Sequence, residues 1–442
     1  MFSHKYLPQT DSDIKEMLAA SGVSNLEDLY SDVPKSLRLK KDYNIPLGKS
    51  EAEVRKIFSS LANKDKQLIC FGGAGVYDHY IPSVIDYITS RSEFLTSYTP
   101  YQAEISQGTL QYIFEYQSMM SELTGLEVSN ASLYDGATAT AEAMMTAISV
   151  TKKKTRVLLS STLNSQVVRV VETYAKFHGV NLTMIPEKDG VTDLSFVKQE
   201  LAIGDIAGVI VPLPNYYGIV EDYSGLADDV HAAKAVFIME CVAADLALLK
   251  SPGEWGADIA VGSGQSLGLP MAYGGANVGF FCAREEFLRK IPGRIVGATI
   301  DSEGKRAFCL TLQTREQHIR REKATSNICS NEGMQTLCVA IYLSIMGKRG
   351  LQEAASKSFS GAHYLYEELL KTGKFEKVYD APFFNEFCLE SKINPDKWEK
   401  TCEVAGFFGG VRIENTNRIM FAVTELRTKE EMDALVALAK DM

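Results

Sequence analysis

Short apolar runs alternate with amphipathic segments through the middle of this chain. We predict helices at residues 111–123, which Gly125 terminates, and at residues 139–147, which follow a glycine-containing loop. The apolar runs have the length of β-strands, and they predict strands at residues 157–160, 182–185, 208–212, 235–239, 258–261 and 278–283. Strands that alternate with helices are typical of a parallel sheet with helical crossovers, so the pattern predicts an α/β fold.

The first 60 residues have a different pattern, that of peripheral helices. Asp11 stands where it would cap a helix, and Gly22 would end that helix. Ser50 and Glu53 have the spacing of a capping box for a second helix. These features predict an N-terminal helical arm at residues 1–60.

The end of the chain predicts a second, smaller domain. Residues 315–346 are predicted as one long or broken helix, and residues 351–370 as another. β-like runs follow at residues 374–378, 384–389 and 418–423, and a closing helix starts behind the capping box of Thr428 and Glu431. The predicted organisation is the arm, a large α/β domain at residues 61–325, and a connecting helix with a small α+β domain at residues 326–442.

Composition and charge exclude several classes of function. The 442 residues are 45% hydrophobic and 23% charged, as in ordinary soluble globular proteins. The net charge of −10 argues against a nucleic-acid partner. The apolar runs are far shorter than the roughly 20 residues that cross a membrane, and the N-terminus lacks the pattern of a signal peptide. Eight cysteines without a CxxC pair predict reduced thiols in a cytoplasmic protein, with no metal site.

A loop of small and hydroxyl residues leads into the helix predicted at residues 139–147. Gly136, Ala137 and Thr138 would let backbone N–H groups approach a phosphate, although a tight turn with a Ser/Thr cap is an equally simple interpretation. A small-residue helix start, a strand ending in an acid and a strand leading to a lysine form the layout of the large pyridoxal-phosphate transferases. The layout fits, but no lysine occurs between Lys250 and Arg284.

Five motifs are similar to those of one known family. They lie at residues 100–108, 214–218, 253–258, 264–268 and 314–327 and read PYQAEISQG, PNYYG, GEWGAD, GQSLG and TREQHIRREKATSN. They resemble the alpha subunit of the two-subunit glycine decarboxylase, the P-protein of the glycine cleavage system. The resemblance covers essentially the whole chain, from an opening motif at residues 2–6 to the final helix.

The resemblance implies a fold, a reaction and partners. The fold would be the pyridoxal-phosphate-dependent transferase fold (fold type I), with a mainly parallel seven-stranded sheet in the large domain. The assembly would be a heterotetramer of two alpha and two beta subunits, with pyridoxal 5'-phosphate bound covalently to the beta subunit. Such an enzyme decarboxylates glycine, releases CO2 and transfers the aminomethyl group to the lipoylated H-protein.

The family's cofactor site would be vestigial in this chain. Alignment on residues 253–256 sets Gln265 and Ser266 against the His-Lys pair of the beta subunit, and it places Met239 where the beta subunit has its cofactor-binding aspartate. A hydroxyl cannot form an imine, and a thioether cannot balance a pyridinium charge. Two alternatives stay open: an autonomous enzyme that uses another lysine, such as Lys234 or Lys250, and a scaffold subunit without a catalytic contribution.

The residues of this chain that would face the partner's site follow from the same resemblance. In this fold the loops of one subunit complete the pocket of the other, and the alternative is that these residues only shape the interface. The pocket candidates are Tyr98, Thr99, Pro100, Tyr101, Gln102, Glu104, Gln107, Thr109, Asn215 and Tyr216. A strand-ending turn would explain the last two equally well.

A basic run at residues 314–327 is the remaining candidate. Its basic groups could hold anions at a subunit interface, or they could form a solvated helix face with i,i+4 ion pairs. The interface candidates are Arg315, His318, Arg320, Arg321 and Lys323.

Overall fold

The computed structural model describes residues 6–41 and 43–442 of the chain, so the motif at residues 2–6 lies almost wholly outside the described residues. The chain forms two compact units, Met1–Lys66 and Gln67–Met442, and each is described by itself. The predicted arm lies within the first unit. The predicted boundary between residues 325 and 326 falls inside the second unit, so that division stays a prediction.

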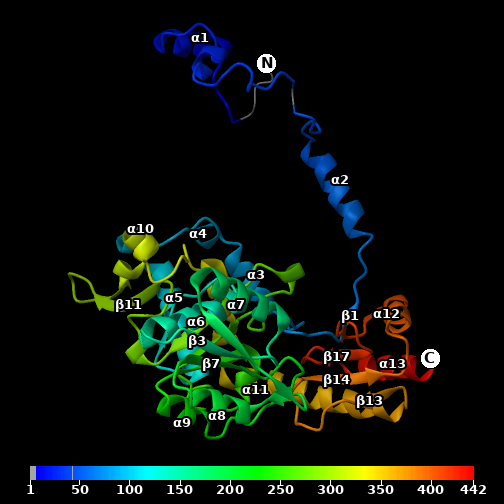
Figure 1. Ribbon diagram of the computed structural model, residues 1–442. Helices are drawn as coiled ribbons and strands as arrows, with labels where there is room; N and C mark the ends of the chain where they lie inside the picture. Colours follow the sequence, from blue (N-terminus) through cyan, green and yellow to red (C-terminus); the bar gives the residue numbers. More distant parts are fainter. Residues whose placement is uncertain (1–5, 42) are drawn as a thin grey trace. The chain divides into compact units, whose positions relative to one another are not determined.

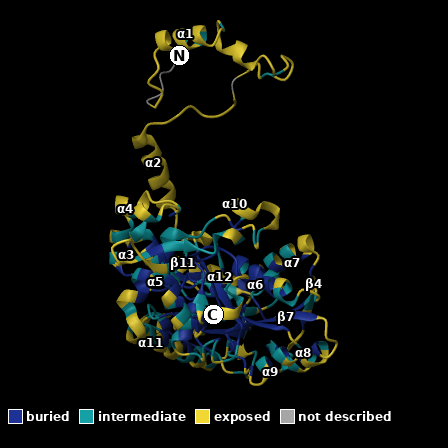
Figure 2. Cartoon of the chain, turned by 90° about the vertical axis from the view of Figure 1, so that its left-hand side faces the viewer, coloured by how far each residue is buried: buried dark blue, intermediate teal, exposed yellow. Residues whose placement is uncertain are grey.

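The first unit consists of short helices joined by irregular chain. Its elements are α1 (Asp11–Ala20), the 3-10 helix η1 (Leu26–Tyr30) and α2 (Glu51–Ala62). The prediction that Asp11 caps α1 is wrong, because Thr10 and Asp13 form a capping box one residue earlier. The predicted box of Ser50 and Glu53 is present at α2. Figure 2 shows α1 and α2 mostly in the colour of exposed residues, and within the described part of this unit the helices bury no side chain.

A seven-stranded sheet lies at the centre of the second unit (Figure 1), as the resemblance implied. Its strands in spatial order are β2 (Val128–Ser129), β10 (Gly279–Ala283), β9 (Ile259–Ser263), β8 (Val236–Val242), β7 (Ile206–Leu213), β3 (Arg156–Ser160) and β4 (Asn181–Ile185). β10 runs antiparallel to both of its neighbours, and the other neighbouring strands are parallel. The six strands predicted from apolar runs all lie in this sheet.

Hydrophobic clusters cover both faces of the sheet, because successive residues of a strand point to opposite sides. Val211 and Met239 belong to the cluster on one face, and Ile210 and Ile238 belong to the cluster on the other. The helices that contribute to these clusters are α5 (Gln107–Thr124), α6 (Gly136–Thr151), α7 (Ser165–His178), α8 (Leu194–Leu201) and α9 (Leu226–Ala232). α6 and α7 lie on one face, and α5, α8 and α9 lie on the other.

The C-terminal part of the unit is a second layer built on a smaller antiparallel sheet. Its strands in spatial order are β13 (Phe375–Lys377), β14 (Glu386–Ser391), β17 (Arg418–Ala422) and β16 (Val411–Arg412), with helices α12 (Pro395–Val404) and α13 (Lys429–Lys440). Trp398 and Phe421 lie in its core. β1 (Ile69–Cys70) pairs with β15 (Phe407–Phe408), so the start of the second unit joins this layer.

Smaller elements connect these layers. They are α3 (Ser83–Thr89), α4 (Ser92–Leu95), β5 (Glu187–Lys188), β6 (Val191–Thr192), β11 (Ile295–Ile300), β12 (Arg306–Thr311) and the 3-10 helices η2 (Ala103–Ile105), η3 (Ala243–Ala247), η4 (Ala272–Gly274), η5 (Glu285–Phe287) and η6 (Gln313–Arg315). No described helix combines the length and the apolar character that a membrane span requires.

The long or broken helix predicted at residues 315–346 is confirmed over residues 333–346 and is mostly wrong over residues 315–332. The structure has only α10 (Gln317–Arg320) and the 3-10 helix η7 (Arg321–Lys323) before α11 (Gly333–Lys371) begins. Tertiary contacts explain the difference, because the buried Arg315 guanidinium donates to the carbonyl oxygens of Ile291 and Gly293 and draws the chain onto a neighbouring loop. The helix predicted at residues 351–370 is the second half of α11, beyond a kink at Gly347.

Candidate functional site

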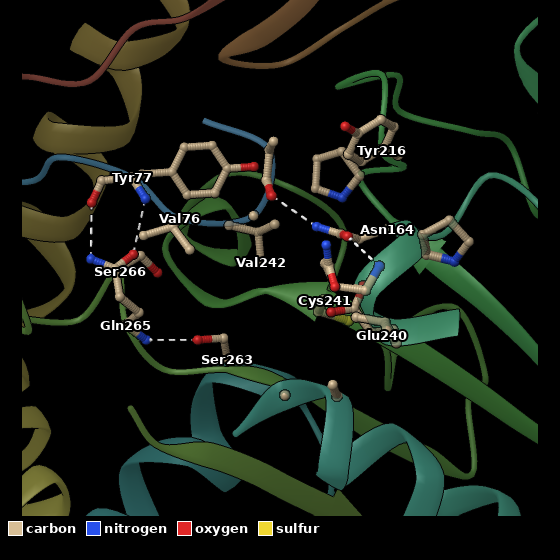
Figure 3. Close-up of a pocket in the computed structure, with 18 of the residues that line it drawn as sticks. Val76, Tyr77, Asn164, Tyr216, Glu240, Cys241, Val242, Ser263, Gln265 and Ser266 are labelled. Carbon is tan, nitrogen blue, oxygen red and sulfur yellow. Dashed lines mark hydrogen bonds between the residues drawn. The ribbon is translucent and has the colours of Figure 1, made fainter. Parts of the chain in front are cut away.

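A cavity of about 270 Å³ lies at the carboxyl edge of the large sheet, beneath residues of the small sheet. The ends of β7, β8 and β9 meet the start of α6 there, and Figure 3 shows Glu240, Cys241, Val242 and Ser263 around it. This edge is where open α/β sheets bind ligands, because the loops after the strands converge there. We call it the sheet-edge cavity.

Gln265 and Ser266, which stand at the predicted lysine position, line this cavity and are both bound to backbone groups. The Gln265 Oε1 accepts the Tyr77 N–H at 3.0 Å, and its Nε2 donates to the Tyr77 carbonyl oxygen at 2.9 Å (Figure 3). The same Nε2 donates to the Leu269 carbonyl oxygen at 2.9 Å. The Ser266 Oγ accepts the Ala244 N–H at 3.1 Å. Both side chains therefore have structural partners within the chain.

Glu240 lines the cavity, whereas the predicted position next to it, Met239, lies in the hydrophobic core. The two residues are consecutive in β8, so their side chains point to opposite sides of the sheet. Burial raises the pKa of Glu240 to about 7. An acid next to Met239 was visible in the sequence, and the direction of its side chain required the register of β8.

Asp135 occupies the amino terminus of α6, where Gly136, Ala137 and Thr138 were predicted to approach a phosphate. Its Oδ1 accepts the Thr138 N–H at 2.7 Å, and its Oδ2 accepts the Thr138 hydroxyl at 3.2 Å. Gly136 is required for close packing, because a Cβ there would lie 2.6 Å from the Ser263 nitrogen. Gly136 and Ala137 line the cavity, whereas Thr138 is absent from its lining. A protein carboxylate thus uses part of the positive end of this helix.

Pyridoxal phosphate does not fit the sheet-edge cavity of this chain. The carboxyl groups of Asp135, Glu240 and Glu386 line it, and its described lining contains no lysine, arginine or histidine. A phosphate dianion would meet three acidic groups without a cation to balance it. No residue of the lining can form a Schiff base with the cofactor's aldehyde. We assign no catalytic step to this cavity.

A segment missed by the sequence analysis closes the cavity from above. Residues 71–80, which we call the crossing segment, connect the two sheets. On the small-sheet side, Glu386 accepts the Ala74 N–H at 2.5 Å and the Tyr77 hydroxyl at 2.8 Å. On the large-sheet side, Asn164 donates to the Ala74 carbonyl oxygen at 2.8 Å. These partners are up to 312 residues apart, so no local sequence signal could have revealed them.

Asn215 and Tyr216 lie at the sheet-edge cavity, in the turn after β7. The Asn215 Nδ2 donates to the Gly190 carbonyl oxygen at 2.7 Å and to Glu221 at 2.8 Å, and its Oδ1 accepts the Tyr217 N–H at 2.9 Å. Asn215 therefore shapes the turn. The ring of Tyr216 faces the cavity in Figure 3, and burial raises its pKa.

The structure does not bring residues 98–109 to this cavity. Tyr98 is 82% exposed and Tyr101 is 54% exposed, whereas Pro100 is buried and Thr99 and Thr109 line a second cavity. The Gln107 amide binds the backbone of β12. Its Nε2 donates to the Phe308 carbonyl oxygen and its Oε1 accepts the Phe308 N–H, each at 2.9 Å. The remaining two, Gln102 and Glu104, are exposed.

The basic run separates into one buried arginine and an exposed group. Arg315 is held by backbone carbonyl oxygens, and burial lowers its pKa. The ring of His318 lies 5.8 Å from that of Tyr101, which joins this run to residues 98–109. The other members, Arg320, Arg321 and Lys323, are exposed. The described residues contain no group of three or more His, Cys, Asp or Glu arranged to hold a metal ion.

A mainly parallel seven-stranded sheet, a small C-terminal sheet and a cavity between them define the fold type I class of pyridoxal-phosphate-dependent enzymes. A solved structure of glutamate decarboxylase from Lactobacillus brevis has this fold, with a TM-score of 0.67 at 13% identity over 92% of this chain and 95% of that one. At this identity the similarity shows the fold alone.

Three comparisons define the family more narrowly. The family model of the glycine cleavage system P-protein matches residues 4–439. The chain is 50% identical over 437 residues to the probable glycine dehydrogenase (decarboxylating) subunit 1 of Moorella thermoacetica, which covers 98% of both chains. A crystal structure of an inhibitor-bound glycine decarboxylase (P-protein) matches 99% of this chain and 100% of its own, with a TM-score of 0.92 and 41% identity. The chain belongs to the glycine cleavage system P-protein family.

Proposed function

We propose that this chain is the alpha subunit of a two-subunit glycine decarboxylase in the glycine cleavage system. With a beta subunit, as two alpha and two beta chains in the cytoplasm, it would decarboxylate glycine, release CO2 and pass the aminomethyl group to the lipoylated H-protein. The family match over residues 4–439 and the subunit 1 relatives support this proposal.

The chemistry of the sheet-edge cavity is the observation that supports different roles for the two subunits. Gln265 and Ser266 are hydrogen-bonded to backbone groups, and carboxyl groups line the cavity. We therefore place pyridoxal 5'-phosphate on the beta subunit, where it would supply the electron sink for decarboxylation. This chain would contribute one half of the assembled enzyme and the surface that faces the active site of the beta subunit.

The partner-facing surface that we propose consists of Tyr98, Tyr101, Gln102, Ile105 and Ile319. The apolar members are unusually exposed for large side chains, with Ile105 at 80% and Ile319 at 48%. Exposed apolar groups that cluster on a monomer are typical of interaction surfaces. Arg294 donates to the Tyr101 hydroxyl at 3.0 Å and so fixes the position of this ring.

The alternative of an autonomous enzyme requires a lysine at a cavity. Lys250 instead lies over the ring of Trp255, with its ammonium nitrogen 3.8 Å from the ring centre, and neither Lys234 nor Lys250 lines the sheet-edge cavity. This arrangement favours the two-subunit interpretation.

Reduction with borohydride tests the assignment. The chain is purified alone and together with the beta subunit, each preparation is incubated with pyridoxal phosphate and reduced, and the modified peptides are mapped by mass spectrometry. We expect the modified lysine only in beta-subunit peptides, and a colourless preparation of this chain alone. A stoichiometric modified lysine in this chain would refute the division of labour, and a purified pair that does not decarboxylate glycine would refute the proposed activity.

A further inference from the structure

A second cavity, of about 110 Å³, lies apart from the sheet-edge cavity and shares no lining residue with it. The polar residues of its wall are Ser97, Tyr98, Thr99, Thr109, Tyr112, Ser330 and Asn331, and the first residue of α11, Gly333, completes the polar side. Its described lining contains no charged side chain. The wall is therefore made of neutral groups that can donate hydrogen bonds.

A buried arginine stands directly behind this wall. Arg294 is 4% exposed, and its guanidinium donates to the Ser330 hydroxyl, to the Thr99 hydroxyl at 3.5 Å and to the Cys329 carbonyl oxygen at 3.0 Å. A guanidinium can only donate, so the two hydroxyl oxygens act as acceptors and keep their own protons. Thr99 and Ser330 lie 3.4 Å apart and can use only one of these protons between themselves. At least one proton is left to donate into the cavity.

Within the described part of the chain, two buried nitrogen atoms in or behind the cavity wall have no hydrogen-bond partner. They are the Arg294 Nε, behind the wall, and the amide Nδ2 of Asn331, whose residue belongs to the wall. A buried donor without an acceptor costs about 1 to 3 kcal/mol, so such groups usually mark a position that an acceptor occupies.

The start of α11 adds donors on the same side. The first intrahelical bond is donated by the Thr336 N–H to the Glu332 carbonyl oxygen, and the side chain of Glu332 makes no capping bond. The N–H groups of Gly333 and Met334 precede that bond, and both residues line the cavity. The positive end of this helix favours an anion.

Two arginines and two acidic residues lie around the site. Arg294 and Arg315 lie near the buried carboxyl group of Glu316, which is 4.0 Å from Arg315, and Glu332 is the N-cap residue of α11. Burial raises the pKa of Glu316 and that of Glu332, whereas Arg315 and Arg294 lower the pKa of Glu316. His318 is the next titratable group along the chain, and it is exposed.

We propose that the second cavity binds an oxyanion, the carboxylate or phosphate group of a small molecule. Thr99, Ser330, Asn331 and the first N–H groups of α11 donate the hydrogen bonds, and Arg294 supplies the positive charge behind them. The site is formed by this chain alone, so it goes beyond the proposed function and does not depend on the partner subunit.

Anion titrations of the full-length chain test the proposal. Thermal unfolding and calorimetric titration are carried out with inorganic phosphate, acetate and glycine, each against sodium chloride at equal ionic strength and constant pH. We expect saturable stabilisation by phosphate or by a carboxylate, and none by chloride. Stabilisation by phosphate alone would identify a phosphate site. Stabilisation by acetate and glycine alone would identify a carboxylate site.

Two variants and a control locate the binding. Asn331→Leu removes an amide from the cavity wall, and we expect it to raise the dissociation constant of the anion about tenfold or more. Ser330→Ala is the second variant, used if Asn331→Leu does not fold. Asn181→Leu, at an exposed position on the edge strand β4, is the matched control and should bind as the original chain does. Stabilisation no greater than that by chloride, or equal binding by Asn331→Leu or Ser330→Ala and the control, would overturn the proposal.

Discussion

Glu240 is a carboxyl group that the fold places in an unfavourable position. It lines the sheet-edge cavity, no hydrogen bond to its side chain is present in the described structure, and burial raises its pKa from 4.5 to about 7. The raised pKa means that the folded chain holds the proton more tightly than the unfolded chain does. Stability contributed by this group is therefore present below pH 4.5 and is lost as the pH rises toward 7.

Glu240→Gln should remove this pH dependence. A pKa difference of this size corresponds to about 3 kcal/mol between the two protonation states. We expect the variant to match the original chain near pH 5 and to be more stable by about 2 to 3 kcal/mol at pH 8, as measured by urea unfolding. Glu322→Gln, at an exposed site, is the control. Equal stability of Glu240→Gln and the original chain at both pH values would show that the carboxylate is solvated or paired.

The crossing segment is the element that joins the two sheets. The Phe71 carbonyl oxygen accepts the Ala422 N–H of β17 at 2.8 Å, and the Asp78 carbonyl oxygen accepts the Thr424 hydroxyl at 2.6 Å. Gln265 holds the same segment from the large-sheet side through both backbone groups of Tyr77. Gln265, the residue before the position predicted for the lysine, thus connects the small sheet to the large one.

Gln265→Ala should weaken the attachment of the crossing segment to the large sheet. The substitution leaves the Tyr77 N–H and the Tyr77 and Leu269 carbonyl oxygens without their partner, which costs about 2 to 3 kcal/mol in the free energy of unfolding. We also expect faster amide hydrogen exchange at residues 74–78. Gln166→Ala, an exposed residue at the same cavity, is the matched control. Unchanged exchange at residues 74–78 in Gln265→Ala would contradict this account of the attachment.

At the scale of the whole molecule, the second unit exposes several large apolar side chains, and Ile105 and Ile319 are among them. The partner-facing surface combines residues 98–105, which end in η2, with Ile319 of α10, more than 200 positions further along the chain. The contact between Tyr101 and His318 brings the two segments together. Covering Ile105 and Ile319 would contribute hydrophobic free energy to assembly with the beta subunit.

Ile105→Glu should therefore weaken assembly without affecting the fold. We expect at least a tenfold weaker association with the beta subunit in size-exclusion or calorimetric measurements, and an unchanged melting temperature of the isolated chain, because Ile105 is exposed. Ile203→Glu, at a residue 63% exposed before β7, is the matched control. If both variants assemble equally well, the interface lies elsewhere on the chain.

Gln102→Ala on the same surface separates a catalytic contribution from a scaffold role. In the reconstituted complex we expect slower glycine decarboxylation with assembly intact, because an exposed amide can donate to groups of the partner's site without being needed for packing. An unchanged rate would favour the scaffold interpretation.

Local patterns predicted much of the fold but little of the site. The strands at residues 157–160 and 208–212 were predictable because continuous apolar runs suit a strand buried on both faces. Only the first part of the helix predicted at residues 315–346 was mispredicted, because Arg315 bonds to backbone carbonyl oxygens of a neighbouring loop. Thr10 was missed as the cap of α1 because three neighbouring residues could each serve as a cap, and only the hydrogen bonds decide.

The sequence by itself determined the fold class, the family and the absence of a lysine between Lys250 and Arg284, because apolar periodicity, long motifs and residue identity are properties of the linear chain. Only the tertiary structure decided that Glu240 rather than Met239 faces the cavity, that Gln265 fastens the crossing segment, and that Arg294 stands behind Thr99 and Ser330. The physical reason is that side-chain direction depends on strand register, and that hydrogen bonds and charges act between groups brought together by folding, whatever their separation in sequence.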